Sequence, residues 1–413
     1  MENKHVPQIR FVGFTGDWAQ RKLGDLVEKL EYGLNANGIE YDGENKYIRI
    51  TDIDDSSHKF LKGNLTTPNT DLSLADNYLL KPGDILFART GASVGKSYIY
   101  NSNDGKVYYA GFLIRARIKT GYNPEFVFQN TLTTKYNNYI AITSQRSGQP
   151  GVNAKEYSNY PIMIPELNEQ TKIGSFFKQL NDIITLHQQE LTTLKQTKQG
   201  FLQKMFPKEG ETVPEIRFPG FTGEWEQKPL KELVERITRK NKNLESKLPL
   251  TISAQFGLVD QETFFNKTVA STNLEGYYLL YNGEFAYNKS YSKGYPLGTV
   301  KRLEKHDKGV LSSLYICFKP LSSVSSDFLT HYFESTAWHK EVSMISVEGA
   351  RNHGLLNISV SDFFGTSHFV PTLEEQNKIG DFFNRLDRSI ALKQSELDTV
   401  QKTKKAFLQK MFV

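Results

Sequence analysis

A large internal repeat limits what this chain can fold into more than any other feature of its sequence. Two blocks occur twice: residues 6–28 return as residues 213–235, and residues 165–206 return as residues 371–412. Fifteen of 23 positions are identical in the first block and 24 of 42 in the second. We call these repeated blocks the frame. The segments between them, 29–164 and 236–370, have nearly equal lengths but little similarity. If the chain had been duplicated for stability alone, the frame and the middle segments should have diverged in sequence to the same extent. We therefore interpret the two middle segments as domains that do the same kind of task on different targets.

Length and composition indicate a folded protein of at least two domains. The chain has 413 residues, of which 38% are hydrophobic and 12% aromatic, which is ample for packed cores. No apolar stretch is long enough for a transmembrane helix, and the polar start does not resemble a secretory signal. A single cysteine, Cys317, excludes an internal disulfide and a multi-cysteine zinc site. We expect a cytoplasmic protein without membrane contact, and its net charge of +5 is compatible with a phosphate-bearing partner without identifying one.

The second repeated block predicts a long helix in each half. Positions spaced alternately by four and three residues run from Ile173 to Met205 and again from Ile379 to Met411. They are apolar except for two polar positions in each copy, His187 and Lys198 in the first and Lys393 and Lys404 in the second. A period of 3.5 residues over more than four heptads is typical of a coiled coil. At about 1.5 Å per residue, each stretch spans roughly 48 Å. We expect the two copies to pair with each other, antiparallel. The alternative is a pair of independent dimerisation helices that bind other chains.

These patterns predict an α+β fold, with two pseudo-symmetric globular heads separated by two long antiparallel coiled-coil helices. The expected domains are head 1 (residues 1–164), a first spacer helix (165–206), a linker (207–212), head 2 (213–370) and a second spacer helix (371–413).

The heads contain strand patterns that end in similar loops. The apolar run Asp84–Ala88 predicts a strand. At its end, and at the aligned place in head 2, a cation precedes a hydroxyl residue: Arg89-Thr90 and Lys289-Ser290. A cation and a short hydroxyl in such a loop suit phosphate contact and recognition of base edges.

Each head also has a polar, glycine-rich loop near its end, and these loops extend the set of candidate nucleic-acid contacts. Arginine can bind guanine with two hydrogen bonds, and asparagine or glutamine can do the same with adenine. For any single residue, a solvated loop side chain is the alternative. The candidates are Arg89, Thr90, Lys96, Ser97, Gln145, Arg146, Gln149 and Asn153 in head 1, and Asn288, Lys289, Ser290, Lys293, Arg351, Asn352 and His353 in head 2.

Several signals that look catalytic do not satisfy their motifs. Residues 91–97 resemble a phosphate-binding loop but have one residue too few between the glycines, and they are followed by a strand pattern. Residues 123–126 resemble an adenine-methyltransferase motif but lack its second proline, so we interpret them as a helix start. The histidines form no metal-binding pattern, since His331, His339 and His353 are too loosely spaced.

The whole layout resembles the specificity subunit of Type I restriction–modification systems. Three features carry the resemblance: the proline–Glu-Gln–Ile entry to each helix, the helix endings at 201–206 and 407–412, and the segment 81–91, which is similar to the first recognition domain of that family. The counterpart of this segment at Gly283–Phe285 departs from the family pattern, so the contacts of head 2 follow from it less directly.

This resemblance implies that each head is a target-recognition domain for one half of a bipartite site in double-stranded DNA, and that the helix pair sets the spacing. It also implies a non-catalytic chain that binds no cofactor. Two methyltransferase subunits would methylate adenine with S-adenosylmethionine, and two restriction/translocase subunits would use ATP and Mg²⁺. Two alternatives remain: a single-chain methyltransferase or nuclease, and a duplicated coiled-coil scaffold whose heads bind protein or RNA. The sequence does not predict the target bases.

Overall fold

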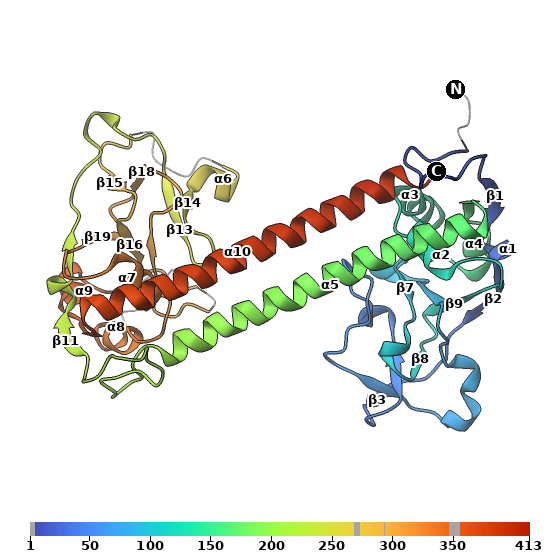
Figure 1. The fold of residues 1–413 in the computed structure, drawn as a ribbon, viewed down its shortest axis with the longest axis horizontal. Coiled ribbons are helices and arrows are strands. Elements are labelled where there is room, and N and C mark those ends of the chain that lie inside the picture. The colour runs from blue at the N-terminus through green and yellow to red at the C-terminus, as the bar shows by residue number, and fades with distance from the viewer. Residues whose placement is uncertain (1–4, 268–272, 293, 347–355) are drawn as a thin grey trace. The chain divides into compact units, whose positions relative to one another are not determined.

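The structure is a computed structural model that describes residues 5–267, 273–292, 294–346 and 356–413. The chain forms two compact units. Unit 1 comprises Met1–Gln188 and Ser395–Val413, and unit 2 comprises Gln189–Gln394. Helix α5 (Leu167–Lys204) begins in unit 1 and ends in unit 2, whereas α10 (Leu373–Lys410) runs from unit 2 into unit 1 (Figure 1). Each unit therefore contains one head and a part of each long helix.

Apart from the long helices, the strands and helices of unit 1 all belong to head 1. The strands are β1 (Ala19–Lys22), β2 (Val27–Tyr32), β3 (Gly38–Glu40), β4 (Lys46–Ile48), β5 (Thr66–Pro68), β6 (Asp84–Ala88), β7 (Ser97–Ile99), β8 (Val107–Tyr109), β9 (Leu113–Ile118) and β10 (Pro161–Ile164). The helices are α1 (Leu23–Leu26), α2 (Pro124–Asn130), α3 (Thr134–Thr143) and α4 (Ala154–Ser158).

Unit 2 follows the same plan. Its strands are β11 (Glu226–Pro229), β12 (Val234–Arg236), β13 (Leu250–Ser253), β14 (Gly257–Asp260), β15 (Tyr278–Tyr281), β16 (Phe285–Asn288), β17 (Thr299–Arg302), β18 (Lys308–Leu311), β19 (Ile316–Pro320) and β20 (Ser367–Val370). Its helices are α6 (Gln261–Phe265), α7 (Ser326–Tyr332), α8 (His339–Ile345) and α9 (Val360–Gly365).

Both heads are built around the same four-stranded antiparallel sheet, in the order β2-β9-β6-β7 in head 1 and β12-β19-β16-β17 in head 2. Every residue of β6 is buried because both faces of the sheet are covered. Ile85 and Phe87 pack into the core shared with the helices, and Leu86 and Ala88 pack into a second core on the opposite face. Burial on both faces explains why this strand has a continuous apolar run instead of an alternating pattern.

A buried ion pair joins the two repeated blocks in each unit. The guanidinium of Arg10 donates to both carboxylate oxygens of Glu169 at 2.6 Å, and Arg217 does the same to Glu375 at 2.6 and 2.7 Å. Both glutamate side chains are completely buried. Each glutamate lies in the first turn of its long helix, where the helix dipole favours a negative charge. The arginine comes from the first block and the glutamate from the second, so the frame is closed by an interaction between segments far apart in the sequence.

The glutamine after each glutamate attaches the head to its helix. The Gln170 side chain donates to the carbonyl of Pro165 at 2.8 Å and accepts from the backbone N–H of Asn123 at 3.0 Å. Gln376 makes the same two bonds, to Pro371 at 2.9 Å and from Ser325 at 2.8 Å. Both amide groups are buried and have partners, as buried polar groups require. Residues 123 and 325 are the N-caps of α2 and α7, so the two copies hold equivalent helices in the same way.

The two long helices pair antiparallel within each unit. In unit 1 the rings of Phe176 and Phe407 lie 5.1 Å apart, and in unit 2 those of Phe201 and Phe382 lie 4.9 Å apart. Residues near the start of α5 therefore contact residues near the end of α10, and residues near the end of α5 contact residues near the start of α10. The predicted α+β fold with a pair of long antiparallel helices is confirmed. Because each apolar seam is covered by its twin, independent dimerisation helices are not favoured.

The end of each long helix packs on the first repeated block of the unit it enters. The Phe412 ring lies 6.4 Å from that of Trp18, and the Phe206 ring lies 6.3 Å from that of Trp225. Alongside, the N–H of Ile9 donates to Lys410, and that of Ile216 donates to Lys204, both at 2.9 Å. Thus each core is completed by the helix that comes from the other half of the sequence.

We predict that Arg217→Met destabilises unit 2 by about 3–5 kcal/mol, because it leaves the buried Glu375 carboxylate without its counter-charge. Urea unfolding of the full chain measures this loss. Arg236→Met is the matched control, since this arginine is exposed and its substitution should change stability by less than about 0.5 kcal/mol. Equal effects of the two substitutions would show that the ion pair does not stabilise the frame.

Candidate nucleic-acid interface

In head 1 the loop after β6 meets the glycine-rich loop that precedes α4. The N–H of Gly91 donates to the carbonyl of Pro150 at 3.0 Å, and the N–H of Val152 donates to the carbonyl of Arg89 at 2.9 Å. Gly91 has a φ of 73°, and a Cβ there would come within 2.9 Å of the Gln149 side chain. Glycine thus allows the two loops to approach closely. The loop after β6 and the glycine-rich loop therefore lie side by side.

Arg89 is presented on two exposed aromatic rings. Its guanidinium lies 5.1 Å from the centre of the Tyr32 ring and 5.6 Å from that of Phe112. The exposed fractions of Tyr32 and Phe112 are 43% and 55%, which is unusual for large aromatic side chains. A planar cation held on aromatic faces can donate to phosphates or base edges, and the rings offer stacking surfaces. Sequence reasoning missed Tyr32 and Phe112, because neither strand pattern distinguishes an exposed aromatic from a core residue.

Four further candidates from the glycine-rich loop are exposed, and two of them stabilise the loop itself. Gln145 and Gln149 project from the loop. Arg146 donates to the Glu156 carboxylate at 2.5 Å. The side chain of Asn153 caps α4 by accepting from the N–H of Glu156 at 2.9 Å. Gln145 and Gln149 are therefore the better candidates for contact with a ligand.

Two predicted contacts in head 1 are corrected by the structure. Ser97 is completely buried, and its hydroxyl hydrogen-bonds that of Thr131 at 2.6 Å. The Lys96 side chain is only 11% exposed, and its ammonium binds the Asp55 carboxylate at 2.5 Å and the Ile53 carbonyl at 2.9 Å. The chain turns back into the sheet as β7 at this point, which carries both side chains away from the surface. Neither remains a candidate for DNA contact.

Head 2 repeats the main-chain arrangement of head 1 with different side chains. The carbonyl of Lys289 accepts from the N–H of Leu356 at 2.9 Å, as the carbonyl of Arg89 does from Val152. The Lys289 ammonium donates to the Ile358 carbonyl at 3.0 Å, and the Asn288 side chain accepts from the N–H of Ser290 at 3.0 Å. Both heads thus place their cation–hydroxyl pair at the same point of the fold. The remaining head 2 candidates, Lys293, Arg351, Asn352 and His353, lie outside the described residues.

Comparisons with known proteins agree on one family. Residues 15–196 match the family model of the Type I restriction modification DNA specificity domain. The specificity subunit of the Type I restriction enzyme MjaVIII from Methanocaldococcus jannaschii is 21% identical to this chain, over 95% of this chain and 91% of that protein. The chain is therefore similar to the specificity subunits of Type I restriction–modification systems.

Two other specificity subunits are similar to a shorter part of the chain or to its fold alone. The specificity subunit of the Type I enzyme HindI from Haemophilus influenzae is 25% identical, over 46% of this chain and 41% of that protein. The S subunit of a Type I restriction–modification system from M. genitalium has the same fold, with a TM-score of 0.63 and 11% identity over 99% of both chains. None of these comparisons supports a scaffold whose heads bind protein or RNA.

The motifs rejected as catalytic have structural roles in this chain. Residues 91–97 lead into strand β7, and Asn123 is the side-chain cap of helix α2, as the sequence predicted. No helix in the described part of the chain combines the length and apolarity needed to cross a membrane.

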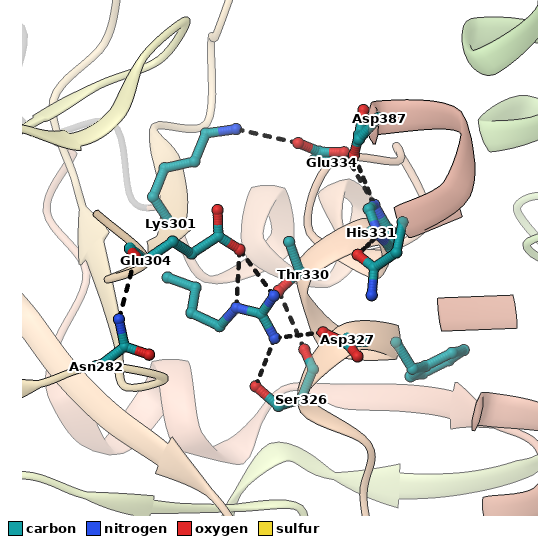
Figure 2. A network of polar contacts seen from close by, with 12 residues as sticks. Asn282, Lys301, Glu304, Ser326, Asp327, Thr330, His331, Glu334 and Asp387 are labelled. Carbon is teal, nitrogen blue, oxygen red and sulfur yellow. Dashed lines mark hydrogen bonds and ion pairs between the residues drawn. The ribbon is translucent and has the colours of Figure 1, made fainter. Parts of the chain in front are cut away.

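A cluster in unit 2 resembles a metal site but is an ion-pair network. Ligand atoms of His331, Glu334 and Asp387 lie within 4.8 Å of one another, and Figure 2 shows their side chains together. The ammonium of Lys198 already lies 2.8 Å from Glu334 and 2.7 Å from Asp387. Sequence reasoning missed this cluster because its members come from α5, from α10 and from the end of α7 with the turn that follows it, without a shared motif.

The charges around Glu334 explain its ionisation. Burial alone raises the pKa of Glu334. The hydrogen bond from His331 and the positive charges of Lys198 and Lys301 outweigh burial and hold this pKa well below its usual range. Glu334 therefore stays ionised and stabilises the folded unit above the unfolded-state pKa near 4.5, and this contribution is lost as the pH falls below that value.

We predict that Lys198→Met destabilises unit 2 by about 1–3 kcal/mol, since it removes the shared cation while Glu334 remains partly buried. Denaturant unfolding at pH 7 gives this value. Repeating the measurement below pH 4.5 should show a smaller loss, because Glu334 is then closer to protonation. Lys195→Met provides the control on an exposed position of the same helix. A pH-independent loss would contradict the proposed ion pair.

Proposed function

We propose that this chain is the DNA-recognition subunit of a Type I restriction–modification complex, and that each head reads one half of a bipartite DNA target. The observation that carries the proposal is the common main-chain bond at Arg89 and Lys289, which presents different side chains from the same place in two otherwise matched heads. Two half-sites of different sequence need this combination of a constant support and variable contacts. The match to a DNA specificity domain and the similarity to a Type I specificity subunit support DNA as the ligand.

The side chains in head 1 suit a DNA groove. Arg89 can donate two parallel hydrogen bonds to guanine or bind a phosphate, and Gln145 or Gln149 can pair with adenine. Tyr32 and Phe112 hold the Arg89 guanidinium in place, so less rotamer entropy is lost when it binds. In head 2 the Lys289 ammonium donates to a backbone carbonyl. We therefore expect other side chains of the loop after β16 to make the DNA contacts of head 2.

The long helices act as the spacer in this proposal. Each is a continuous helix of 38 residues, which corresponds to about 57 Å. Pairing with the twin through aromatic contacts stiffens both helices. A stiff spacer would fix the number of unread base pairs between the half-targets.

The chemistry is assigned to partner subunits. Two methyltransferase subunits would bring S-adenosylmethionine and methylate adenine, and two restriction/translocase subunits would bring ATP and Mg²⁺. This chain would be non-catalytic and would act in the cytoplasm. Support comes from the features that imitate catalytic sites: the glycine segment at 91–97 leads into a strand, and Lys198 neutralises the carboxylates beside His331.

We expect Arg89→Ala to weaken target binding by the assembled methyltransferase complex by about 1–3 kcal/mol, because the arginine supplies a charged contact to DNA. Binding to a labelled duplex at several salt concentrations measures the effect and shows whether a phosphate contact has been lost. Lys81→Ala is the control, as it removes an exposed cation at the opposite end of strand β6. Equal losses in the two variants would exclude a local role for Arg89.

Exchange of residues 29–164 for the matching segment of another family member should change one half-target only. Each head has its own sheet and cores, so head 2 and its contacts should be unaffected. Mapping of methylated adenines in a host that carries the hybrid reads out both halves at once. A change in both halves would refute the assignment of one half-target to each head, and methylation by the chain without partners would refute the non-catalytic role.

A further inference from the structure

The repeat places a second lysine at the position of Lys198, and this lysine lacks the partners of the first. Lys404 lies on α10 where Lys198 lies on α5, since the repeated helices align at a shift of 206 residues. It belongs to unit 1 and is partly buried. Among the described residues, no hydrogen bond or ion pair holds its ammonium, whereas Lys198 binds two carboxylates at 2.7–2.8 Å.

The partners of Lys198 are replaced one by one in unit 1. Asp387 corresponds to Asn181 in the aligned helices. Helices α2 and α7 are equivalent because both are capped at the residue that binds the buried helix glutamine, which aligns Glu334 with Leu132 and His331 with Gln129. Neither carboxylate has a counterpart at the aligned positions of unit 1, whereas the lysine does.

A cavity of about 340 Å³ opens beside Lys404. Its lining offers positive charge from Lys59, Lys404 and Lys405 and an amide from Asn181. The hydroxyls of Ser56 and Ser57, which also line it, donate to the Asp54 carboxylate at 2.8 and 2.7 Å. No aspartate or glutamate belongs to the lining residues of this cavity in the described structure. The Lys59 ammonium also donates to the Thr185 hydroxyl. Such a cavity attracts an anion, because it combines lysine cations that have no ion-pair partner in the described structure with an amide donor.

Burial shifts the pKa values of the titratable groups around the cavity in the direction that favours their uncharged forms. Burial, together with the nearby charge of Lys59, lowers the pKa of Lys404 to about 8, although Glu125 acts to raise it. Burial also lowers the pKa of Lys59 and that of His58, and it raises the pKa of Glu125. Asp182 and Asp104 raise the pKa of Lys59, but burial outweighs them. In the described structure no carboxylate forms an ion pair with either lysine as Glu334 and Asp387 do with Lys198.

We propose that this cavity of unit 1 is a binding site for a carboxylate ligand, which takes the place that the Asp387 and Glu334 carboxylates occupy in unit 2. The twin site supplies the geometry: carboxylate oxygens lie 2.7–2.8 Å from the lysine ammonium. The volume admits either a small free dicarboxylate or an acidic side chain of another subunit. This inference concerns neither of the DNA-facing loops and stands apart from the proposed function.

The first test is a calorimetric titration of the full chain with malonate at constant ionic strength, with uncharged malonamide as the matched probe. We expect saturable binding of malonate alone. Lys404→Met should weaken that binding at least tenfold, whereas Lys402→Met, an exposed lysine on the same helix, should leave it within twofold. Absence of saturable malonate binding, or equal effects of the two substitutions, would overturn the proposal.

A second variant supplies the carboxylate from the chain itself. Its expected effect is a gain of stability, so it cannot be mistaken for a failure to fold. Asn181→Asp restores the carboxylate that the twin position has in Asp387. It should raise the unfolding temperature in malonate-free buffer and abolish the stabilisation by malonate. A lower unfolding temperature, or malonate binding unchanged from the parent chain, would contradict the site.

The source of the natural carboxylate is found by repeating the titration on the assembled methyltransferase complex. Retained malonate binding identifies a free carboxylate as the occupant. Loss of malonate binding on assembly identifies an acidic side chain of a partner subunit. Both results require that malonate binds the isolated chain, so a failure of the site is separate from a failure of DNA recognition.

Discussion

The fold depends on the buried arginine–glutamate pair that closes each half of the frame. Arg10 and Glu169, like Arg217 and Glu375, come from opposite ends of a head, and their two parallel hydrogen bonds fix how the long helix leaves it. Such a pair need not add much stability over an apolar contact, since desolvation offsets the attraction. Its bidentate geometry does specify one arrangement, because any other would leave a buried carboxylate without its partner.

The same pair explains why the frame is similar in the two halves while the middle segments differ. Frame residues have partners in distant segments: Trp18 packs on Phe412, and Gln170 binds the cap of α2. A substitution there disturbs two elements at once. The loop side chains after β6 and β16 are supported through the main-chain carbonyls of Arg89 and Lys289, which accept a hydrogen bond whatever side chain the residue carries. Specificity can therefore change without disturbing the fold.

Features that repeat along the sequence were predictable from it, whereas contacts between residues that only folding brings together were not. The coiled-coil seam repeats over several heptads, so the helix pair followed from periodicity, and the aligned loops after β6 and β16 followed from the repeat. Lys96 and Ser97 were misplaced because the chain returns into the sheet within a few residues of Arg89. Tyr32 and Phe112 were missed, since their exposure depends on how two separate strands end. The Lys198 network combines residues without any spacing rule.

Duplication also provides an internal comparison that a single domain would lack. The same helix position carries lysine in both units, yet only Lys198 is neutralised by carboxylates of its own chain. An apolar residue at 404 would fill the seam without the desolvation cost that lowers the pKa of the present lysine. Lys404 therefore weakens unit 1 unless a counter-charge arrives from outside. The two units thus differ in charge at one position of an otherwise symmetric frame. In unit 2 the lysine is paired with carboxylates of the chain itself, whereas in unit 1 it can bind an anion from outside.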